Sequence, residues 1–585
     1  MQIESRRAAR AARAGGESAR RRRNHGRAWL IVALIAIVLL GAVSWLAFRA
    51  LTVKTDLEAA QALVSNLDDG LPLDERLAEV GALAQSASTA SNDPLWRAAE
   101  FVPLAGENLR AVRLASEMLD MLANNVATPI LALKSEPAGG SLIASMLPIL
   151  EERTPAIAQL SDEIEAVRAS TALVGPVRSG LDQIGEITSS AVPLLEVAPD
   201  LLGADGPKSY LLVFQNNAES LPLGGSAASQ TLISVDAGNL AIVQQASSAS
   251  FQEGIPVDVA VDQSALDLYS RYLIDHVNTA TSRPDFPTAA QIIRAFWNRD
   301  INPSHVDGVI SIDPIALGRI LLSTGPIVVG DVEVNSGNAV PVLLSDVYRW
   351  WNPYASPAEA LKSDAFFAGV AETVFAKLSS GEFDLKDMAW AVNESIAQGD
   401  IMVWTDDPEV GQFLAGQRVA GTLPTDNSLS TAVGVFFRDT SASKIDYYMN
   451  SGVTLAMSCD AGLATFSASV QLHLDISQED ANRLPPYVKS APWGSSKFRT
   501  EVFIYGPPGT TFVEASVDGR DLQPTRTDIT DLGRPVAAFE VFLKPSESGT
   551  VTASFAGAGE FGPLELRSTP MIRTTQATIE GGCTG

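Results

Sequence analysis

A polar segment directly after a short apolar run has the residue types that best suit ligand binding. Asn216, Asn217 and Glu219 supply amide and carboxylate oxygens, and the apolar run Tyr210–Phe214 has the length of a buried strand. In α/β sheets, ligands collect at the carboxyl ends of strands. The glycine pair at 224–225 permits close approach of the backbone, so its N–H groups could hold an anion. The alternative is an ordinary polar turn closed by Asn and Gly.

A second polar segment, Arg283-Pro-Asp285, precedes a helical pattern. The Asp285 carboxylate could coordinate a hard cation such as Mg²⁺ together with Glu219. The Arg283 guanidinium could then face an anionic group. The alternative is that Asp285 only fixes the turn before the helix. Asp307 and Asp313 are a third acidic pair, and Asp313 is most simply the N-cap of the helix that begins at Pro314.

Signatures of the common catalytic classes are absent from the sequence. The chain holds no GxSxG elbow, no P-loop and no HExxH. A GxGxxG match at 557–562 lies in a strand-rich region and is followed by Pro563, so no helix opens there to receive a pyrophosphate. The four histidines lie apart in the sequence, and His276, His305 and His473 are interpreted as surface or structural residues. The sequence therefore identifies no catalytic residue.

The pattern of elements predicts an α+β multidomain protein. Residues 52–200 carry apolar side chains at helical spacing, which predicts a helical stalk or bundle. Residues 207–425 alternate strands with helices, which indicates an α/β layer domain. One of those helices begins with a capping box, Ser356-Pro-Ala-Glu359. Residues 430–585 carry strand-like runs separated by turns, which is typical of a β-sandwich. These runs are 433–437, 453–457, 464–476, 499–505, 512–517, 536–543 and 551–555.

The first 48 residues predict a membrane anchor. Residues 28–48 contain no charged side chain, and about 20 residues of helix span a bilayer. Residues 1–27 hold nine arginines against two glutamates. The positive-inside rule places this basic tail in the cytoplasm and the rest of the chain outside as an ectodomain. The alternative is a signal peptide cleaved at the small residues 42–44.

The charge is distributed unevenly between the tail and the rest of the chain. Because the whole chain carries −26, the residues after the tail are strongly acidic. The arginine cluster adjoins the membrane segment, where it sets topology and contacts anionic lipids. We therefore expect no nucleic-acid partner.

The two cysteines, Cys459 and Cys583, both lie in the part expected outside the cell. An oxidising compartment permits a disulfide between them. It would close a loop of about 124 residues and, in the chain-entropy model, stabilise the fold by roughly 4–5 kcal/mol. Two free buried thiols are the alternative. The chain has no CxxC motif, so a Cys/His zinc site is not expected.

Several separated motifs, in the same order, resemble bacterial membrane proteins that carry the domain of unknown function 4012. The motifs are 93–96, 210–219, 285–290, 306–314, 325–326 and 444–448, and the resemblance covers roughly residues 90–510. The family is common in actinobacteria and other bacteria with large envelopes and has no established activity. The resemblance therefore implies a location in the cell envelope more than a mechanism. Members usually carry an Arg two residues after the motif Glu, where this chain has Leu221.

The motif order is also loosely similar, at the level of the fold, to the LytR-CpsA-Psr ligases, which attach lipid-carried glycopolymers to the cell wall. That similarity implies a polyprenyl pyrophosphate held by Arg and Asp residues with a divalent metal. Leu221 removes one such Arg, and an acidic ectodomain repels polyanions unless arginines or a metal reverse the local sign.

Two hypotheses of different classes remain. The first is a non-catalytic scaffold or partner-binding protein of envelope assembly, in contact with envelope proteins or lipid-linked glycans. The second is a divergent metal-dependent phosphotransferase acting on polyprenyl-linked glycopolymers. In the second, Glu219 and Asp285 hold Mg²⁺ and Arg283 faces the pyrophosphate. The absence of a catalytic signature favours the first.

Overall fold

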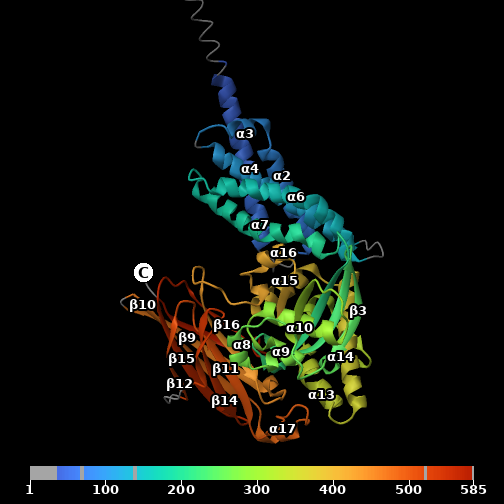
Figure 1. Ribbon diagram of the computed structural model, residues 1–585. Helices are drawn as coiled ribbons and strands as arrows, with labels where there is room; N and C mark the ends of the chain where they lie inside the picture. Colours follow the sequence, from blue (N-terminus) through green and yellow to red (C-terminus); the bar gives the residue numbers. More distant parts are fainter. Residues whose placement is uncertain are drawn as a thin grey trace, which may run out of the picture. The chain divides into compact units, whose positions relative to one another are not determined.

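The computed structural model describes residues 34, 36–65, 71–103, 105–135, 141–460, 462–518 and 524–582 (Figure 1). The chain divides into two compact units. One comprises residues 1–138 and 148–196, and the other comprises residues 139–147 and 197–585. An N-terminal apolar helix and further helices precede the sheets along the chain, which confirms the predicted mixed α+β class. The predicted boundaries near residues 200 and 425 stay predictions.

The first unit is helical. Its helices are Ala36–Ser65, α2 (Leu73–Ser91), α3 (Pro94–Ala99), α4 (Gly106–Asp120), the π-helical η1 (Met121–Ala127), α5 (Thr128–Ser135), most of α6 (Leu142–Arg168) and most of α7 (Gly175–Leu201). Apolar side chains three or four residues apart on one helical face form its core. Leu114 and Met118 of α4, for example, are fully buried with Ile157 and Ile164 of α6 in one cluster.

The N-terminal helix changes its surroundings along its length. Among the described residues it is the one helix long and apolar enough to cross a membrane. Its first turns expose large apolar side chains, and Ile37, Leu40 and Val43 are 65–67% exposed. Further along, Val53 and Ala60 are each 1% exposed and belong to the core of the helical unit. Such a helix fits a membrane anchor or a signal sequence.

The second unit contains a five-stranded sheet in the order β3-β2-β1-β4-β7. The strands are β1 (Lys208–Leu221), β2 (Gly224–Asp236), β3 (Asn239–Ser247), β4 (Gly308–Ile312) and β7 (Ile401–Thr405). β1 and β4 are parallel, with Leu211 opposite Val309, and the other neighbours are antiparallel. We call the side where β1 and β4 end the carboxyl end of the sheet. The side where they begin, and where β7 ends, is its amino end.

Alternate side chains of β1 face two different cores, as the two-residue period of a strand requires. Leu211 and Val213 pack with helix α10 (Phe286–Asp300). Leu212 and Phe214 pack against the core that holds α11 (Pro314–Thr324) and α14 (Pro357–Ser380). Helices therefore cover both faces of the parallel pair, which explains why Tyr210–Phe214 is apolar without alternation.

Side-chain caps begin two helices at the predicted positions. Asp313 Oδ1 accepts the N–H groups of Ile315 and Ala316, both at 2.9 Å. Ser356 Oγ accepts the N–H of Glu359 at 3.2 Å. Both N-cap predictions are confirmed, and the Asp313 cap fixes the start of α11 directly after β4.

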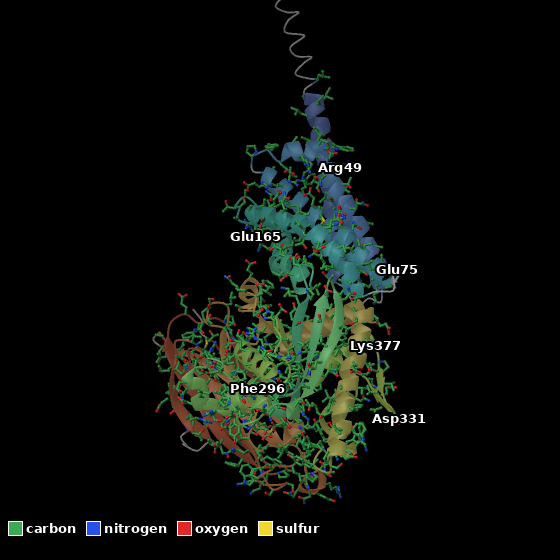
Figure 2. The ribbon with its side chains drawn as sticks, turned by 45° about the vertical axis from the view of Figure 1, so that its right-hand side comes forward. Arg49, Glu75, Glu165, Phe296, Asp331 and Lys377 are labelled. Atoms are coloured by element: carbon green, nitrogen blue, oxygen red, sulfur yellow. The ribbon has the colours of Figure 1, made fainter. Side chains whose placement is uncertain are left out.

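Short elements complete this part of the chain. They are η2 (Ser248–Ser250), α8 (Gln263–Tyr269), α9 (Tyr272–Asp275), η3 (Val277–Ser282), β5 (Ile327–Val329), β6 (Val332–Val334), α12 (Ala339–Pro341), η4 (Val342–Asp346), α13 (Val347–Trp350), α15 (Leu385–Gln398), α16 (Pro408–Leu414) and η5 (Arg418–Ala420). Asp331 lies in the exposed turn between β5 and β6, whereas Phe296 of α10 is fully buried (Figure 2).

The C-terminal region forms two further five-stranded sheets, in the orders β12-β15-β10-β9-β17 and β13-β14-β11-β8-β16. The elements are β8 (Thr431–Asp439), η6 (Ile445–Tyr448), β9 (Met449–Asp460), β10 (Leu463–Leu474), α17 (Gln478–Arg483), β11 (Phe498–Tyr505), β12 (Thr511–Val517), β13 (Arg526–Asp531), β14 (Arg534–Leu543), β15 (Ser548–Ala558), β16 (Leu564–Ser568) and β17 (Gln576–Gly581). Val435 of β8 and Val470 of β10 share one core, so the two sheets pack face to face as a sandwich.

The seven strand-like runs of the sequence correspond to β8, β9, β10, β11, β12, β14 and β15. Three more strands were not predicted. Every residue of β17 is exposed, and β13 pairs irregularly with β14, so neither shows the apolar alternation of a half-buried strand. Cys459 lies in β9, whereas Cys583 lies outside the described residues, so their pairing stays a prediction.

Candidate functional site

The two asparagines predicted to bind a ligand lie buried at the carboxyl end of the sheet. Asn216 Nδ2 donates to the Tyr348 hydroxyl at 2.9 Å. Asn217 is fully buried, and its Nδ2 donates to the Asp313 carboxylate at 2.7 Å and to the Pro570 carbonyl at 3.2 Å. Their amide donors are therefore used inside the fold.

Glu219 forms an internal ion pair. One carboxylate oxygen binds the Lys444 ammonium, and the other accepts the Ser226 hydroxyl. The Lys444 side chain is 3% exposed, and its ammonium lies 4.7 and 4.8 Å from the ring centres of Tyr348 and Tyr487. Burial alone would lower the pKa of Lys444, but Glu219 and the two tyrosines raise it above its ordinary value. Lys444 therefore stays protonated.

The glycine pair closes the hairpin between β1 and β2. Gly224 has a φ of +127°, which favours glycine. A Cβ on Gly225 would lie 2.2 Å from the carbonyl carbon of Asn216. The Gly225 N–H donates to Gln215 Oε1 at 2.7 Å. The glycines thus allow a close contact between backbones, and the Gly225 N–H already has its acceptor.

Arg283 and Asp285 come together in a buried network before α10. Arg283 Nη1 lies 3.8 Å from Asp285 Oδ2, and Nη2 donates to Asp531 and Asp262, both at 2.7 Å. The side chains of Arg283 and Asp531 are 3% and 0% exposed. Burial raises the pKa of Asp285, whose carboxylate accepts the Thr288 hydroxyl in the first turn of α10.

These contacts give the predicted metal ligands different partners. Among the described residues, Glu219 binds Lys444 and Ser226, and neither of these contacts Asp285. A Mg²⁺ ion shared by Glu219 and Asp285 stays a prediction that no described contact supports. Leu221, which stands where relatives usually carry an Arg, is 4% exposed and packs inside the fold.

A different group of side chains gathers at the amino end of the sheet. Asp307 precedes β4 and Asp406 follows β7, and Gly308 lies opposite Thr405 in this antiparallel pair. The Asp406 N–H donates to the Asp307 carbonyl at 2.9 Å. His305 Nε2 lies 3.5 Å from Asp307 Oδ1 and 3.4 Å from Asp406 Oδ2. One imidazole nitrogen and two carboxylate oxygens therefore lie within 4.8 Å of one another.

The backbone of the sheet positions this group while leaving it open to solvent. Asp307 Oδ2 accepts the Ser209 N–H of β1 at 2.7 Å, which orients the carboxylate. The side chains of His305, Asp307 and Asp406 are 70%, 20% and 29% exposed. A dissolved ion or ligand can therefore reach all three.

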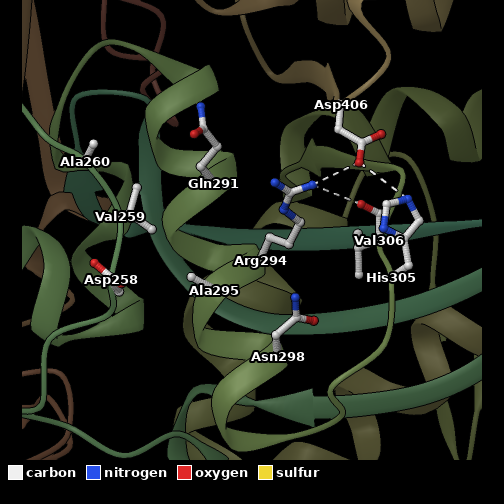
Figure 3. A pocket seen from close by; sticks show the side chains of 10 residues that line it. All are labelled: Asp258, Val259, Ala260, Gln291, Arg294, Ala295, Asn298, His305, Val306 and Asp406. Atoms are coloured by element: carbon white, nitrogen blue, oxygen red, sulfur yellow. Dashed lines mark hydrogen bonds and ion pairs between the residues drawn. The ribbon is translucent and has the colours of Figure 1, made fainter.

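A cavity of about 500 Å³ adjoins this cluster (Figure 3). One face of α10 lines it with side chains three or four residues apart, as the helical repeat requires. These are Gln291, Arg294, Ala295 and Asn298. In Figure 3 the segment 258–260 lies to one side of α10, and His305, Val306 and Asp406 lie to the other. The opposite face of α10 is buried and anchors the helix.

Arg294 is the permanently charged cation among the lining residues. Its guanidinium lies 4.6 Å from the ring centre of Trp404. Nη1 donates to the Val306 carbonyl at 3.3 Å and to Asp406 Oδ2 at 3.2 Å. The guanidinium has five N–H donors, so most remain for a ligand oxygen. One turn further along α10, the buried Oδ1 of Asn298 has no donor among the described residues.

Negative charge dominates the amino end. Burial raises the pKa of Tyr210, and the carboxylates of Asp307, Asp200 and Asp406 raise it further. Lys208 donates to Asp200 at 2.8 Å, and this hydrogen bond raises the pKa of Lys208. Such a concentration of carboxylates attracts cations from solution.

The donor set of the cluster suits a divalent transition metal. Imidazole with two carboxylates favours Zn²⁺, Mn²⁺ or Fe²⁺ over Mg²⁺, which prefers oxygen ligands alone. A metal held by three protein side chains keeps open coordination positions, and a molecule bound in the cavity could occupy them. Arg294 could bind an anionic group of the same ligand, because its planar fork matches carboxylates and phosphates.

The sequence interpretation missed this group. It treats His305 as isolated and does not single out Asp406. The two residues are about 100 positions apart and meet only because β4 and β7 are neighbours. In the sequence, Asp307 directly precedes the strand β4 and Asp406 directly follows the strand β7. This pattern indicates a shared site only once the pairing of β4 with β7 is known.

Comparison with protein families places a known domain over much of this region. Residues 205–348 match the family described as "Protein of unknown function (DUF4012)". The match includes the predicted residues of the carboxyl end, together with Arg294, His305 and Asp307, whereas Asp406 lies beyond it. No curated protein matches the chain. This is the family that the sequence motifs resemble. Neither the family match nor the search of curated proteins shows a similarity to the LytR-CpsA-Psr ligases.

Proposed function

We propose that this DUF4012-domain protein is a membrane-anchored, non-catalytic component of the cell envelope. Its exported region binds an anionic envelope ligand at the amino end of the sheet. A divalent transition metal held by His305, Asp307 and Asp406 forms one half of the site, and Arg294 forms the other. The observation that carries this proposal is that a metal-binding donor set and an arginine adjoin one cavity of about 500 Å³.

The N-terminal helix is the anchor in this proposal, with residues 1–27 in the cytoplasm and the ectodomain outside. The nine arginines of the tail support this orientation. The exposed apolar turns support insertion into lipid rather than packing in a core. Trp45 Nε1 donates to Asp93 at 3.1 Å, and Arg49 pairs with the same carboxylate at 3.4 Å. These contacts link the N-terminal helix to the start of α3 within the helical unit.

Protease digestion of intact spheroplasts tests the orientation. An epitope at the N-terminus should be protected while the ectodomain is degraded. Intact mass spectrometry of the purified protein should show the uncleaved N-terminus. A mature chain that begins near residue 45 would instead establish a signal peptide and contradict the anchor.

Two features support binding over turnover. The residues of the phosphotransferase hypothesis are held by internal partners, since Glu219 pairs with Lys444 and Arg283 with Asp531. In addition, the described lining of the amino-end cavity contains no Ser, Thr, Cys or Lys that could serve as a nucleophile.

A metal-dependent phosphotransferase is the second candidate, and the same cluster is the observation that favours it. A bound cation could activate a water molecule, and Arg294 could stabilise charge on a phosphoryl oxygen. Turnover of a polyprenyl-pyrophosphate-linked glycan by the full chain, lost in Asp406→Asn, would establish this candidate. An intact substrate after prolonged incubation supports the binding role.

Site-specific crosslinking in cells tests the proposed binding role. A photoreactive residue at Gln291, on the exposed rim of the cavity, should give a discrete adduct. The same residue at Asp331, in the exposed β5–β6 turn, is the control and should give none. The adduct should disappear in Asp406→Asn. Equal adducts at positions 291 and 331, or none at 291, would contradict the proposal.

An exported location also predicts a disulfide between Cys459 and Cys583. β17 runs parallel to β9 with Gly581 opposite Met457. The last described strand residues therefore lie beside the part of β9 that leads to Cys459. Peptide mapping without reductant should recover the linked pair, and two alkylatable thiols in the native protein would contradict it.

A further inference from the structure

A second, smaller cavity lies where strands β8 and β16 approach the end of β1 and the segment 418–423. Its volume is about 30 Å³, whereas one water needs roughly 10–15 Å³. Two guanidinium groups, those of Arg418 and Arg567, line this space together with Ser568. The cavity is separate from the amino-end site, so a ligand bound in it is independent of the proposed function.

Arg567 has an unused buried donor. Its side chain is 15% exposed, and Nε lies 2.6 Å from Glu565 Oε1. That oxygen does not lie along the N–H direction, so Nε has no hydrogen-bond acceptor among the described residues. The other oxygen of Glu565 accepts the Ser430 hydroxyl at 2.6 Å. A buried guanidinium N–H without an acceptor is costly, which points to an acceptor within the cavity.

Arg418 brings a second positive charge to the same space. Its Nε and Nη2 donate to the carbonyls of Ala397 and Gln398, at 3.1 and 3.3 Å, where α15 ends. Burial lowers the pKa of Arg418 to about 10, and Arg567 lowers it further. Glu565 and Asp400 act in the opposite direction, but Glu565 pairs with Arg567 and Asp400 is bound by Arg319.

A third arginine adds to the excess of positive charge. Arg534 is fully buried and donates to the carbonyls of Ala432 and Gly506 at 2.7 and 3.1 Å. Burial lowers its pKa to about 10, and Arg567 contributes. The charge of Arg567 lowers the pKa of both Arg418 and Arg534, and Arg567 itself pairs with Glu565. Buried charges of one sign require a counter-charge.

We infer that this cavity binds one small tetrahedral oxyanion, inorganic phosphate or sulfate, between Arg418 and Arg567. The planar guanidinium fork matches two oxygens of such an anion, and the Ser568 hydroxyl is a further donor at the cavity. Because the lining residues come from β16, β8, the segment after η5 and the residues after β1, the anion fastens the β-sandwich to the five-stranded sheet.

Phosphate titration of the full chain in detergent tests this inference. The protein is dialysed into a buffer free of phosphate and sulfate, and its melting temperature is followed against phosphate. Sodium gluconate at matched ionic strength is the control salt. We expect a saturable rise in phosphate that exceeds the rise in gluconate by a few degrees. The same response is expected in Arg573→Gln, because Arg573 is a partly exposed arginine that does not line the cavity and serves as the matched control.

The response should be lost in Arg567→Gln. Arg567→Lys keeps the positive charge but removes the fork, so its phosphate affinity by calorimetric titration should fall at least tenfold while its fold is retained. The lysine variant keeps the test decisive if the glutamine variant does not fold. Equal phosphate responses in the wild type and Arg567→Lys, or a wild-type response no larger than in gluconate, would overturn the inference.

Discussion

The two ends of the five-stranded sheet carry similar residue types in opposite settings. At the carboxyl end, Asn217 and Glu219 are held by Asp313 and Lys444. At the amino end, His305, Asp307 and Asp406 are partly exposed beside a cavity. A carboxyl end is the usual place for a ligand in α/β sheets. Here the C-terminal region covers it, because Lys444, Asp446 and Pro570 all contact residues 217–220.

The difference shows that solvent access, and not residue type, separates the two roles. The buried polar network of the carboxyl end uses most of its donors and acceptors inside the fold and specifies how two regions pack. At the exposed strand end, Asp406 also accepts from Arg294 and Asp307 from Ser209, but both side chains are partly exposed and an ion from solution can reach them. Substitutions at the two ends should therefore affect stability and ion binding differently.

Arg283→Met should produce the largest loss of stability. It leaves the fully buried Asp531 without its cation, and breaking a buried ion pair costs about 3–5 kcal/mol. Arg271→Met is the control, because Arg271 is 68% exposed and pairs weakly with Asp275 at 3.7 Å. It should cost about 0–1 kcal/mol. Urea unfolding of both variants measures the difference, and equal losses would show that the buried network is not structural.

Asp439 should make the protein less stable as the pH rises, whereas a salt-bridged carboxylate makes a protein more stable as the pH rises. Asp439 is partly buried near Asp446, and desolvation raises its pKa to about 6 although Ser441 and Ser443 donate to it. The unfolded value is about 3.9, so the folded state holds this proton more tightly. The stabilisation present below about pH 4 is therefore lost as the pH rises through about 6.

The slope of the unfolding free energy between pH 4 and 6 measures this effect. In the wild type the Asp439 contribution falls with rising pH, and in Asp439→Asn that contribution is absent. The difference between wild type and variant in urea midpoints at pH 4, 5, 6 and 7 isolates the residue. A difference that does not change with pH, or that changes in the opposite sense, would show that Asp439 is not protonated in the folded state.

His305→Ala should have the smallest effect on stability. The side chain is 70% exposed, and exposed substitutions usually change the free energy of unfolding by less than about 0.5 kcal/mol. Thermal melting without added metal checks this. A loss of 2 kcal/mol or more would mean that the amino end is as structural as the carboxyl end, and the contrast between the two ends would fail.

Elements with a clear local pattern could be predicted from the sequence. Asp313-Pro314 and Ser356-Pro357 each combine a capping side chain with a first-turn proline, and both begin helices. β10 alternates buried and exposed residues over nearly its whole length. β17 could not be predicted, because all six of its residues are exposed and only its parallel pairing with β9 defines it.

The roles of the candidate residues depend on contacts between distant segments. Glu219 and Lys444 are more than 200 residues apart, and their pairing turns an apparent ligand residue into a structural one. Similarly, His305 and Asp406 meet only through the pairing of β4 with β7. Local sequence supplies the side chains, but long-range strand pairing decides which of them remain open to solvent.

Calorimetric titration of the full chain with Mn²⁺ or Zn²⁺ measures whether the amino end of the sheet binds a metal. We predict one site in the wild type and in the surface control Asp331→Asn. Affinity should be at least about tenfold weaker in Asp406→Asn and unchanged in Asp285→Asn. Unaltered binding in Asp406→Asn would contradict the amino-end metal site, and a loss confined to Asp285→Asn would favour Asp285 as the metal ligand instead.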